Sequence, residues 1–137
     1  MAKTKEDEAR EILAKLRFIE GQMATVQGQL SMLERGLVEI GTTKMSLDSI
    51  KTLAKDSNSL LPLGSGMFAK GVLLKQDKVL VDVGAGTIVE KELTEAEKIL
   101  ETREKDIRTN MTNFQQLLAT FEKQYNELAD RARSFSG

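Results

Sequence analysis

A seven-residue repeat of apolar side chains constrains the fold of this chain more than any other feature. Over residues 5–55 apolar residues alternate three and four positions apart. A repeat sustained over that length is typical of a coiled coil, and the helix would be ~75 Å long at ~1.5 Å per residue. In heptad letters the a positions are Leu16, Met23, Leu30 and Leu37, and the d positions are Ile12, Ile19, Val26, Leu33, Ile40 and Leu47.

A second repeat of the same kind occupies the C-terminal part of the chain, from about residue 94 to residue 135. Its first two a positions are Glu97 and Glu104, and the remaining ones are apolar or aromatic. Two such helices within one chain can pack on each other in opposite directions, so we predict an antiparallel coiled-coil hairpin. The d positions are Leu100, Ile107, Phe114, Phe121, Leu128 and Phe135, and the later a positions are Met111, Leu118, Tyr125 and Ala132.

Between the two repeats the apolar period changes from 3.5 to two, which is typical of strands. Glycine-containing turns at residues 64–66 and 84–86 divide this segment. We predict four short strands in two β-hairpins, at about residues 60–63, 67–74, 79–83 and 87–91. The chain is therefore predicted to be a single α+β unit, with a helix over residues 5–57, two hairpins over 58–93 and a helix over 94–135.

The predicted hairpins need a partner, because two-stranded sheets are marginally stable and their apolar faces require cover. Both helices are already occupied with each other in the coiled coil. We therefore predict that the strands pack against the sheet of another subunit and form the oligomer interface. The residues predicted to make this interface are Leu61, Leu63, Phe68, Val72, Val79, Val81, Val83 and Ile88.

Composition excludes several classes of function. The chain has 20 Lys and Arg against 21 Asp and Glu, so it lacks the basic excess of a nucleic-acid-binding protein. It has no apolar run long enough to span a membrane and no apolar N-terminal segment for secretion, which favours a cytoplasmic protein. It has no His and no Cys, the commonest general base and the thiolate metal ligand. We expect no enzyme activity, no metal and no cofactor.

The register between the two helices can be estimated from where they end. If the chain leaves the helices symmetrically at residues 58 and 93, Leu16 lies opposite Phe135; a register one heptad away competes with this one. Near the strands, Lys44 and Lys51 occupy a positions on the first helix, at the same end as the two seam glutamates. These charges either pair across the seam, or their long stems extend and the charges stay in water.

In this register residues before about 14 have no partner on the second helix. Ile12 and Leu13 would therefore extend beyond it, and Phe18 would point outward at a c position. Exposed apolar side chains at the free end of a charged rod indicate an interaction surface, and fraying of the last turns would add seam residues to it. The predicted client-binding residues are Ile12, Leu13, Leu16, Phe18, Leu128 and Phe135.

The strand segment is similar to a known family. Residues 61–71, Leu-Pro-Leu-Gly-Ser-Gly-Met-Phe-Ala-Lys-Gly, and residues 81–91, Val-Asp-Val-Gly-Ala-Gly-Thr-Ile-Val-Glu-Lys, resemble the two-hairpin core of alpha-type prefoldins. Beta-type prefoldin subunits carry a single hairpin. The order of helix, four strands and helix also matches, so the resemblance covers nearly the whole chain. The hairpin motifs are fairly specific, whereas the helices match only in pattern.

This resemblance implies an ATP-independent holdase chaperone. Two alpha-type and four beta-type subunits would form a hexamer, with the hairpins in a central double β-barrel and the coiled coils extending from it. Unfolded polypeptide clients would bind at the coiled-coil tips and pass to a group II chaperonin. Some archaeal alpha-type relatives instead assemble with themselves into filaments that act as chaperones or scaffolds. A simple coiled-coil spacer would explain the helices but not the strands.

Overall fold

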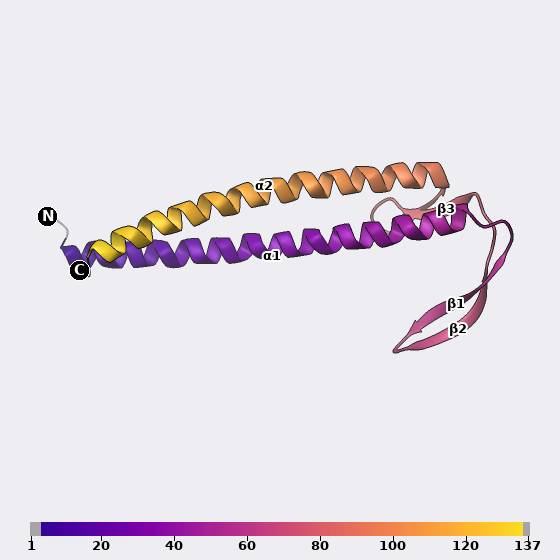
Figure 1. The fold of residues 1–137 in the computed structure, drawn as a ribbon, viewed down its shortest axis with the longest axis horizontal. Helices are drawn as coiled ribbons and strands as arrows, with labels where there is room; N and C mark the ends of the chain where they lie inside the picture. The colour runs from indigo at the N-terminus through magenta and orange to yellow at the C-terminus, as the bar shows by residue number, and fades with distance from the viewer. Residues whose placement is uncertain (1–3, 136–137) are drawn as a thin grey trace. The chain divides into compact units, whose positions relative to one another are not determined.

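The computed structural model describes residues 4–135 as two long helices joined by two β-hairpins (Figure 1). This confirms the predicted arrangement of secondary structure. None of the helices in the described residues is long and apolar enough to cross a membrane. The elements are α1 Lys5–Lys51, β1 Ser57–Gly64, β2 Met67–Leu73, β3 Lys78–Asp82, β4 Ile88–Glu92 and α2 Leu93–Ser134.

The chain divides into two compact units, and the first contains the two chain ends. It comprises α1 up to Leu37 and α2 from Asp106 onward, and the two helix segments run in opposite directions (Figure 1). The predicted heptad frame is confirmed here, because every a and d side chain from Ile12 to Leu37 is buried or half-buried. Ile12 is the most buried of these, with 3% of its surface exposed.

The second unit, Val38–Lys105, contains the end of α1, both hairpins and the start of α2. Its core is small and apolar and consists of Ile40 and Leu47 from α1 with Leu93, Ala96 and Leu100 from α2.

Beside this core the predicted seam charges meet in pairs. Lys44 Nζ forms an ion pair with Glu104 Oε2, and Lys51 Nζ lies 3.5 Å from Glu97 Oε1. Of the two alternatives for these charges, pairing across the seam is the one observed. Because both pairs are partly exposed, each contributes at most about 1 kcal/mol.

The register between the helices of the first unit differs from the predicted one. The Tyr125 hydroxyl donates a hydrogen bond to Glu20 Oε1 at 3.0 Å. A Cβ atom built on Gly36 would lie 3.1 Å from Cδ1 of Ile107. These contacts place Leu16 opposite Leu128, so the prediction of Phe135 was wrong by one heptad. The cause is the end of α1, which lies at Lys51, about one heptad before the predicted end at residue 57.

The corrected register changes the exposure of the N-terminal turns. Ile12 was predicted to extend beyond α2, and this was wrong, because it is buried in the seam. Leu13 and Phe18 are exposed, as predicted, with 49% and 66% of their surfaces accessible.

The two hairpins share one turn geometry. β1 pairs antiparallel with β2, and β3 with β4. All three residues of each turn, 64–66 and 84–86, have positive φ, including Ser65 and Ala85 at 52°. Left-handed backbone favours glycine, which explains the two Gly-X-Gly sequences. β1 begins at Ser57 rather than near residue 60, because its first three residues pair with β2 instead of continuing the helix.

The register predicts which engineered disulfide can form in this cysteine-free chain. With Leu16→Cys and Leu128→Cys combined, we expect rapid oxidation to an intramolecular disulfide, because the two positions share a layer of the seam. Leu16→Cys with Phe135→Cys is the matched control, since those positions differ by about one heptad, or ~10 Å along the axis. Non-reducing electrophoresis with mass spectrometry distinguishes them, and preferential oxidation of the control pair would contradict the observed register.

The ion pair at the end of the seam predicts a measurable coupling. Lys51→Glu places two carboxylates together and should lower the free energy of unfolding by up to ~1 kcal/mol, and adding Glu97→Lys should recover part of that loss. Urea denaturation of the wild type, both single variants and the double variant gives the coupling energy. A coupling energy of zero would show that the two charges act independently.

Candidate functional sites

The β1–β2 hairpin exposes an apolar face to solvent. Residues paired across two strands have side chains on the same face, so Leu60, Pro62, Phe68 and Val72 share one side. All of them are exposed, and Leu60 has 64% of its surface accessible. Asn58 and Lys70 lie on this face as well, so its apolar side chains surround one charged group. Exposed apolar side chains gathered on a two-stranded sheet indicate a surface that can be covered in an assembly.

The other face of this hairpin is more tightly packed. Leu61 lies across Gly71, where a Cβ atom would be 3.0 Å from the Leu61 side chain, so glycine permits this close approach.

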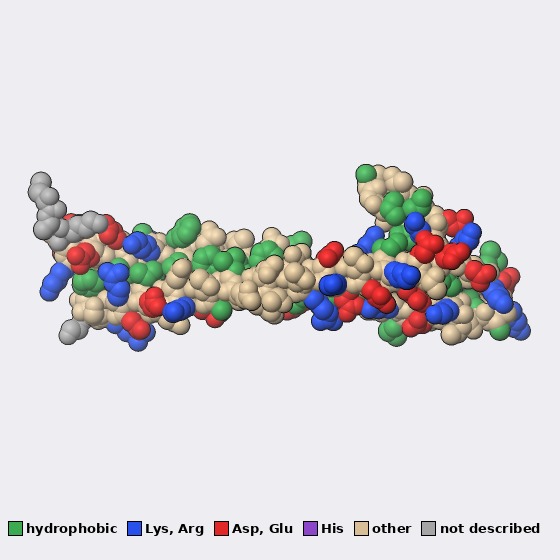
Figure 2. Space-filling model, turned by 90° about the horizontal axis from the view of Figure 1, so that it is seen from above, with side chains coloured by type: hydrophobic (Ala, Val, Ile, Leu, Met, Phe, Trp, Pro, Cys, Tyr) green, Lys and Arg blue, Asp and Glu red, His purple; other side chains and the backbone are tan. Residues whose placement is uncertain are grey.

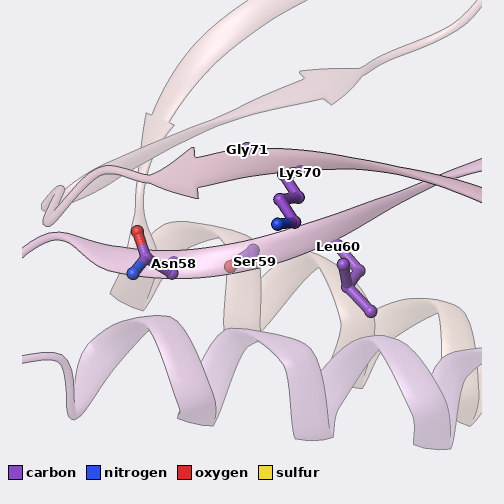
Figure 3. A pocket seen from close by; sticks show the side chains of 5 residues that line it. All are labelled: Asn58, Ser59, Leu60, Lys70 and Gly71. Atoms are coloured by element: carbon purple, nitrogen blue, oxygen red, sulfur yellow. The ribbon is translucent and has the colours of Figure 1, made fainter.

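A hollow on the hairpin is lined by residues of both strands (Figure 3). Its lining includes Asn58, Ser59 and a single charged group, the ammonium of Lys70, which is not an arrangement for acid–base chemistry.

The β3–β4 hairpin also exposes two large apolar side chains, on a face that they share with the charged residues Lys78, Asp82, Glu90 and Glu92. Leu80 has 74% of its surface accessible and shares this face with Ile88, whereas Val79 and Val81 on the other face are half-buried. Arg103 Nη2 on α2 donates a hydrogen bond to the carbonyl oxygen of residue 82 at 3.0 Å, which holds the end of β3 against α2.

Six of the eight residues predicted to form the interface are therefore exposed, and two are half-buried. The prediction took Leu61 from β1 and missed Leu60, whose side chain lies on the other face together with the predicted Phe68 and Val72. It missed Leu80 for the same reason, because Val79 and Val81 lie on the opposite face of β3. The six exposed residues are Leu61, Leu63, Phe68, Val72, Val83 and Ile88.

A groove of ≈ 410 Å³ opens on the surface of the first unit. Its apolar lining combines Phe18 and Ile19 of α1 with Phe121 and Leu128 of α2. Its polar lining carries both signs of charge and one amide: Lys15, Gln124, Glu127 and Arg131. Such a groove can accept an apolar side chain of a bound polypeptide. Because its rim carries both positive and negative groups, it does not favour polypeptides of one net charge.

Two of the six predicted client-binding residues, Phe18 and Leu128, lie together in this groove. Leu16 and Phe135 are half-buried, and Leu13 is exposed but does not line the groove. Ile19 and Phe121 were missed because they were assigned only to the seam. The sequence signal that could have found them is Phe18, an outward-pointing aromatic residue directly beside the seam residue Ile19.

One hydrogen bond lies close to the groove. Tyr125 donates to the Glu20 carboxylate, and this bond raises the pKa of the tyrosine, with smaller contributions from the charge of Glu20 and from burial. The phenol therefore remains a hydrogen-bond donor at neutral pH. Within residues 4–135 no group of three or more His, Cys, Asp or Glu could hold a metal ion.

Comparison with known proteins identifies the family. The model of the prefoldin subunit family matches residues 19–136, which is most of the chain. The chain belongs to the prefoldin family. The prefoldin subunit alpha of Archaeoglobus fulgidus is 32% identical over 130 residues, covering 92% of this chain and 95% of the relative. That of Pyrococcus horikoshii is 28% identical, covering 92% of this chain and 86% of the relative.

Two solved prefoldin structures have a similar fold. The filamentous prefoldin of Methanocaldococcus jannaschii is 25% identical, with a TM-score of 0.73 over 89% of this chain and 98% of that one. The prefoldin beta subunit of Thermococcus strain KS-1 is 16% identical, with a TM-score of 0.60 over 93% of this chain and 90% of that one, and shows the fold alone. Membership of the prefoldin family implies a chaperone role and confirms the resemblance found in the sequence.

The exposed face of the β1–β2 hairpin predicts the effect of charge on assembly. Phe68→Asp combined with Val72→Asp should release lower oligomers or monomers, because burying two carboxylates in an apolar interface is costly. Size-exclusion chromatography with light scattering measures the mass, and circular dichroism should still show largely helical chains. Met45→Asp, at an exposed apolar residue of α1, is the matched control and should assemble normally. Normal assembly of the double variant would show that this face is not an interface.

Proposed function

We propose that this prefoldin subunit is an ATP-independent holdase that captures unfolded proteins and passes them to a group II chaperonin in the cytoplasm. The groove of the first unit is the observation that carries this proposal. Phe18 is two-thirds exposed beside the apolar lining, where an unfolded chain could cover it. Binding there requires no nucleotide, metal or other cofactor.

Capture by this groove would be weak for a single subunit. Burial of apolar surface contributes roughly 25 cal/mol per Å², and part of that is offset by ordering of the bound chain. Several subunits joined in one assembly present several grooves at high effective concentration. Weak individual contacts then combine into useful affinity, and release needs only competition from refolding or from the chaperonin.

The exposed hairpin faces supply the means of joining subunits. Edge-to-edge pairing of the hairpin strands between subunits would close the sheets into a β-barrel, whose interior would cover one face of each hairpin. In the proposed hexamer two copies of this chain combine with four beta-type subunits. The exposed apolar side chains on both hairpins support this proposal, because burying them in an assembly removes their apolar surface from water.

A second assembly is favoured by a specific observation, the similarity to the filamentous prefoldin of Methanocaldococcus jannaschii. In that case the hairpins would pair with those of identical copies, and the filament would act as a chaperone or as a coiled-coil scaffold. Light scattering of the purified chain, alone and mixed with a beta-type subunit, distinguishes the two. Growth of large particles without a partner supports the filament, and a defined hexamer only in the mixture supports the hetero-oligomer.

The groove predicts the effect of a single substitution on chaperone activity. Phe18→Gln should weaken suppression of aggregation of a chemically unfolded client several-fold, because loss of one exposed ring at each groove removes apolar area worth roughly 1 kcal/mol or more. Light scattering of the diluted client measures suppression. Val38→Gln removes an equally exposed apolar side chain that does not line the groove and should leave protection unchanged. Full protection by the Phe18 variant would show that the groove does not bind clients.

A further inference from the structure

The first unit contains a stretch without any charged side chain. No residue of α1 from 21 to 33, and none of α2 from 109 to 121, is charged, although charged residues make up 30% of the chain. The two runs lie opposite each other, because Glu20 contacts Tyr125 and Gly36 lies beside Ile107. Figure 2 shows tan and green atoms predominating along the middle of the helical pair.

Large exposed apolar side chains occur on one side of this stretch. Phe18, Thr25 and Met32 follow each other at intervals of seven, so they share one outward position on α1. On α2, Leu117 shares its heptad position with Gln124, which lines the same groove as Phe18. Met32 has 65% of its surface accessible and Leu117 has 41%.

We call this side the charge-free ledge. The opposite side of α1, at Ala24, Gln27 and Ser31, has no large apolar side chain. The residues of the ledge are Phe18, Gln22, Thr25, Gln29 and Met32 of α1 with Leu117 of α2.

The pattern of the ledge does not suit another helix. A helix packs along apolar residues repeated every three or four positions. On α1 the ledge offers only amides and a hydroxyl between Phe18 and Met32, and Leu117 of α2 is the single apolar residue beside them. The amides and the hydroxyl both donate and accept hydrogen bonds, so they can pair with the N–H and C=O groups of an extended peptide. Charged side chains, Lys15, Glu127 and Arg131, line the groove at the Phe18 end of the ledge. From there to Met32 the ledge has no charges that a bound apolar chain would have to desolvate.

The spacing of the apolar residues defines the matching peptide. Phe18 and Met32 are fourteen residues apart on a helix, or ~21 Å. An extended chain covers that distance in about six residues at ~3.3 Å each. Side chains six residues apart in an extended chain point to the same side, so both could contact the ledge at once.

We propose that the charge-free ledge binds an extended, uncharged client segment with two apolar side chains about six residues apart. One apolar side chain occupies the groove beside Phe18, the other covers Met32, and the segment between them passes Leu117 of α2. The proposal rests on the proposed function and extends the binding surface from the groove toward the middle of the coiled coil. It predicts that clients are selected for uncharged segments as well as for apolar content.

The absence of cysteine allows the contact to be located by labelling. Gln29→Cys on the ledge and Gln27→Cys on the opposite side are labelled, in the full-length assembly, with an environment-sensitive fluorophore. The probe is a seven-residue peptide with Phe first, Leu last and Ser, Gln and Gly between them. We expect an emission shift at position 29 and none at position 27. Equal shifts at both positions, or none at position 29, would overturn the proposal.

Substitutions without a label test the same contact. In fluorescence anisotropy with the same peptide, Met32→Gln should weaken binding about fivefold, corresponding to ~1 kcal/mol. Met45→Gln, at a methionine of similar exposure on α1, should not. A peptide with central Glu and Lys residues should bind more weakly than the uncharged one. Equal binding of the two peptides, or unchanged binding by Met32→Gln, would overturn the proposal.

The outcomes separate this proposal from the one on which it rests. If Phe18→Gln weakens peptide binding and client protection while Met32→Gln changes neither, the groove functions alone and the ledge proposal is wrong. If Phe18→Gln leaves client protection intact, the proposed function is wrong, and the ledge proposal is wrong with it.

Discussion

The apolar seam between α1 and α2 is the interaction on which the other features of this prefoldin subunit depend. Each helix buries its seam against the other, so neither has an apolar stripe left to cover a sheet. The hairpins between the helices therefore retain exposed apolar side chains, Leu60 and Phe68 on one and Leu80 on the other. When two helices bury their apolar residues against each other in this way, the apolar residues of the strands can be buried only by another subunit.

Periodicity alone was sufficient to predict the heptad frame and the two hairpins. A seven-residue repeat specifies which side chains face the partner helix whatever the register, and Gly-X-Gly turns specify where strands reverse. The register could not be obtained in the same way, because it depends on where the helices end, and ends are the least certain part of a sequence-based prediction. Residues 57–59, Ser-Asn-Ser, form a strand because β2 is available to pair with them, which is tertiary information.

The residues of the candidate groove show the same difference between what the heptad pattern predicts and what depends on packing between the helices. Phe18 could be predicted as exposed because its outward position follows from the heptad frame alone. The assignment of Ile12 failed because its exposure depended on register, and the corrected register gives it a partner on α2. Ile19 and Phe121 lie in the groove although they are seam residues, since a groove beside a seam exposes the edges of seam side chains.

A polar contact selects one register between the two helices, which the apolar seam alone does not. A shift of one heptad leaves apolar residues opposite apolar residues along most of the seam, so packing alone discriminates weakly between the two registers. Such a shift to the predicted register would separate Tyr125 from Glu20, whereas Lys44 and Glu104 are close enough along the helices to pair in either register. The Tyr125–Glu20 contact lies directly beside the charge-free stretch, since Glu20 is the residue before its first residue on α1. The middle of the coiled coil can therefore lack charges without losing its register, which leaves that surface available for binding an uncharged chain.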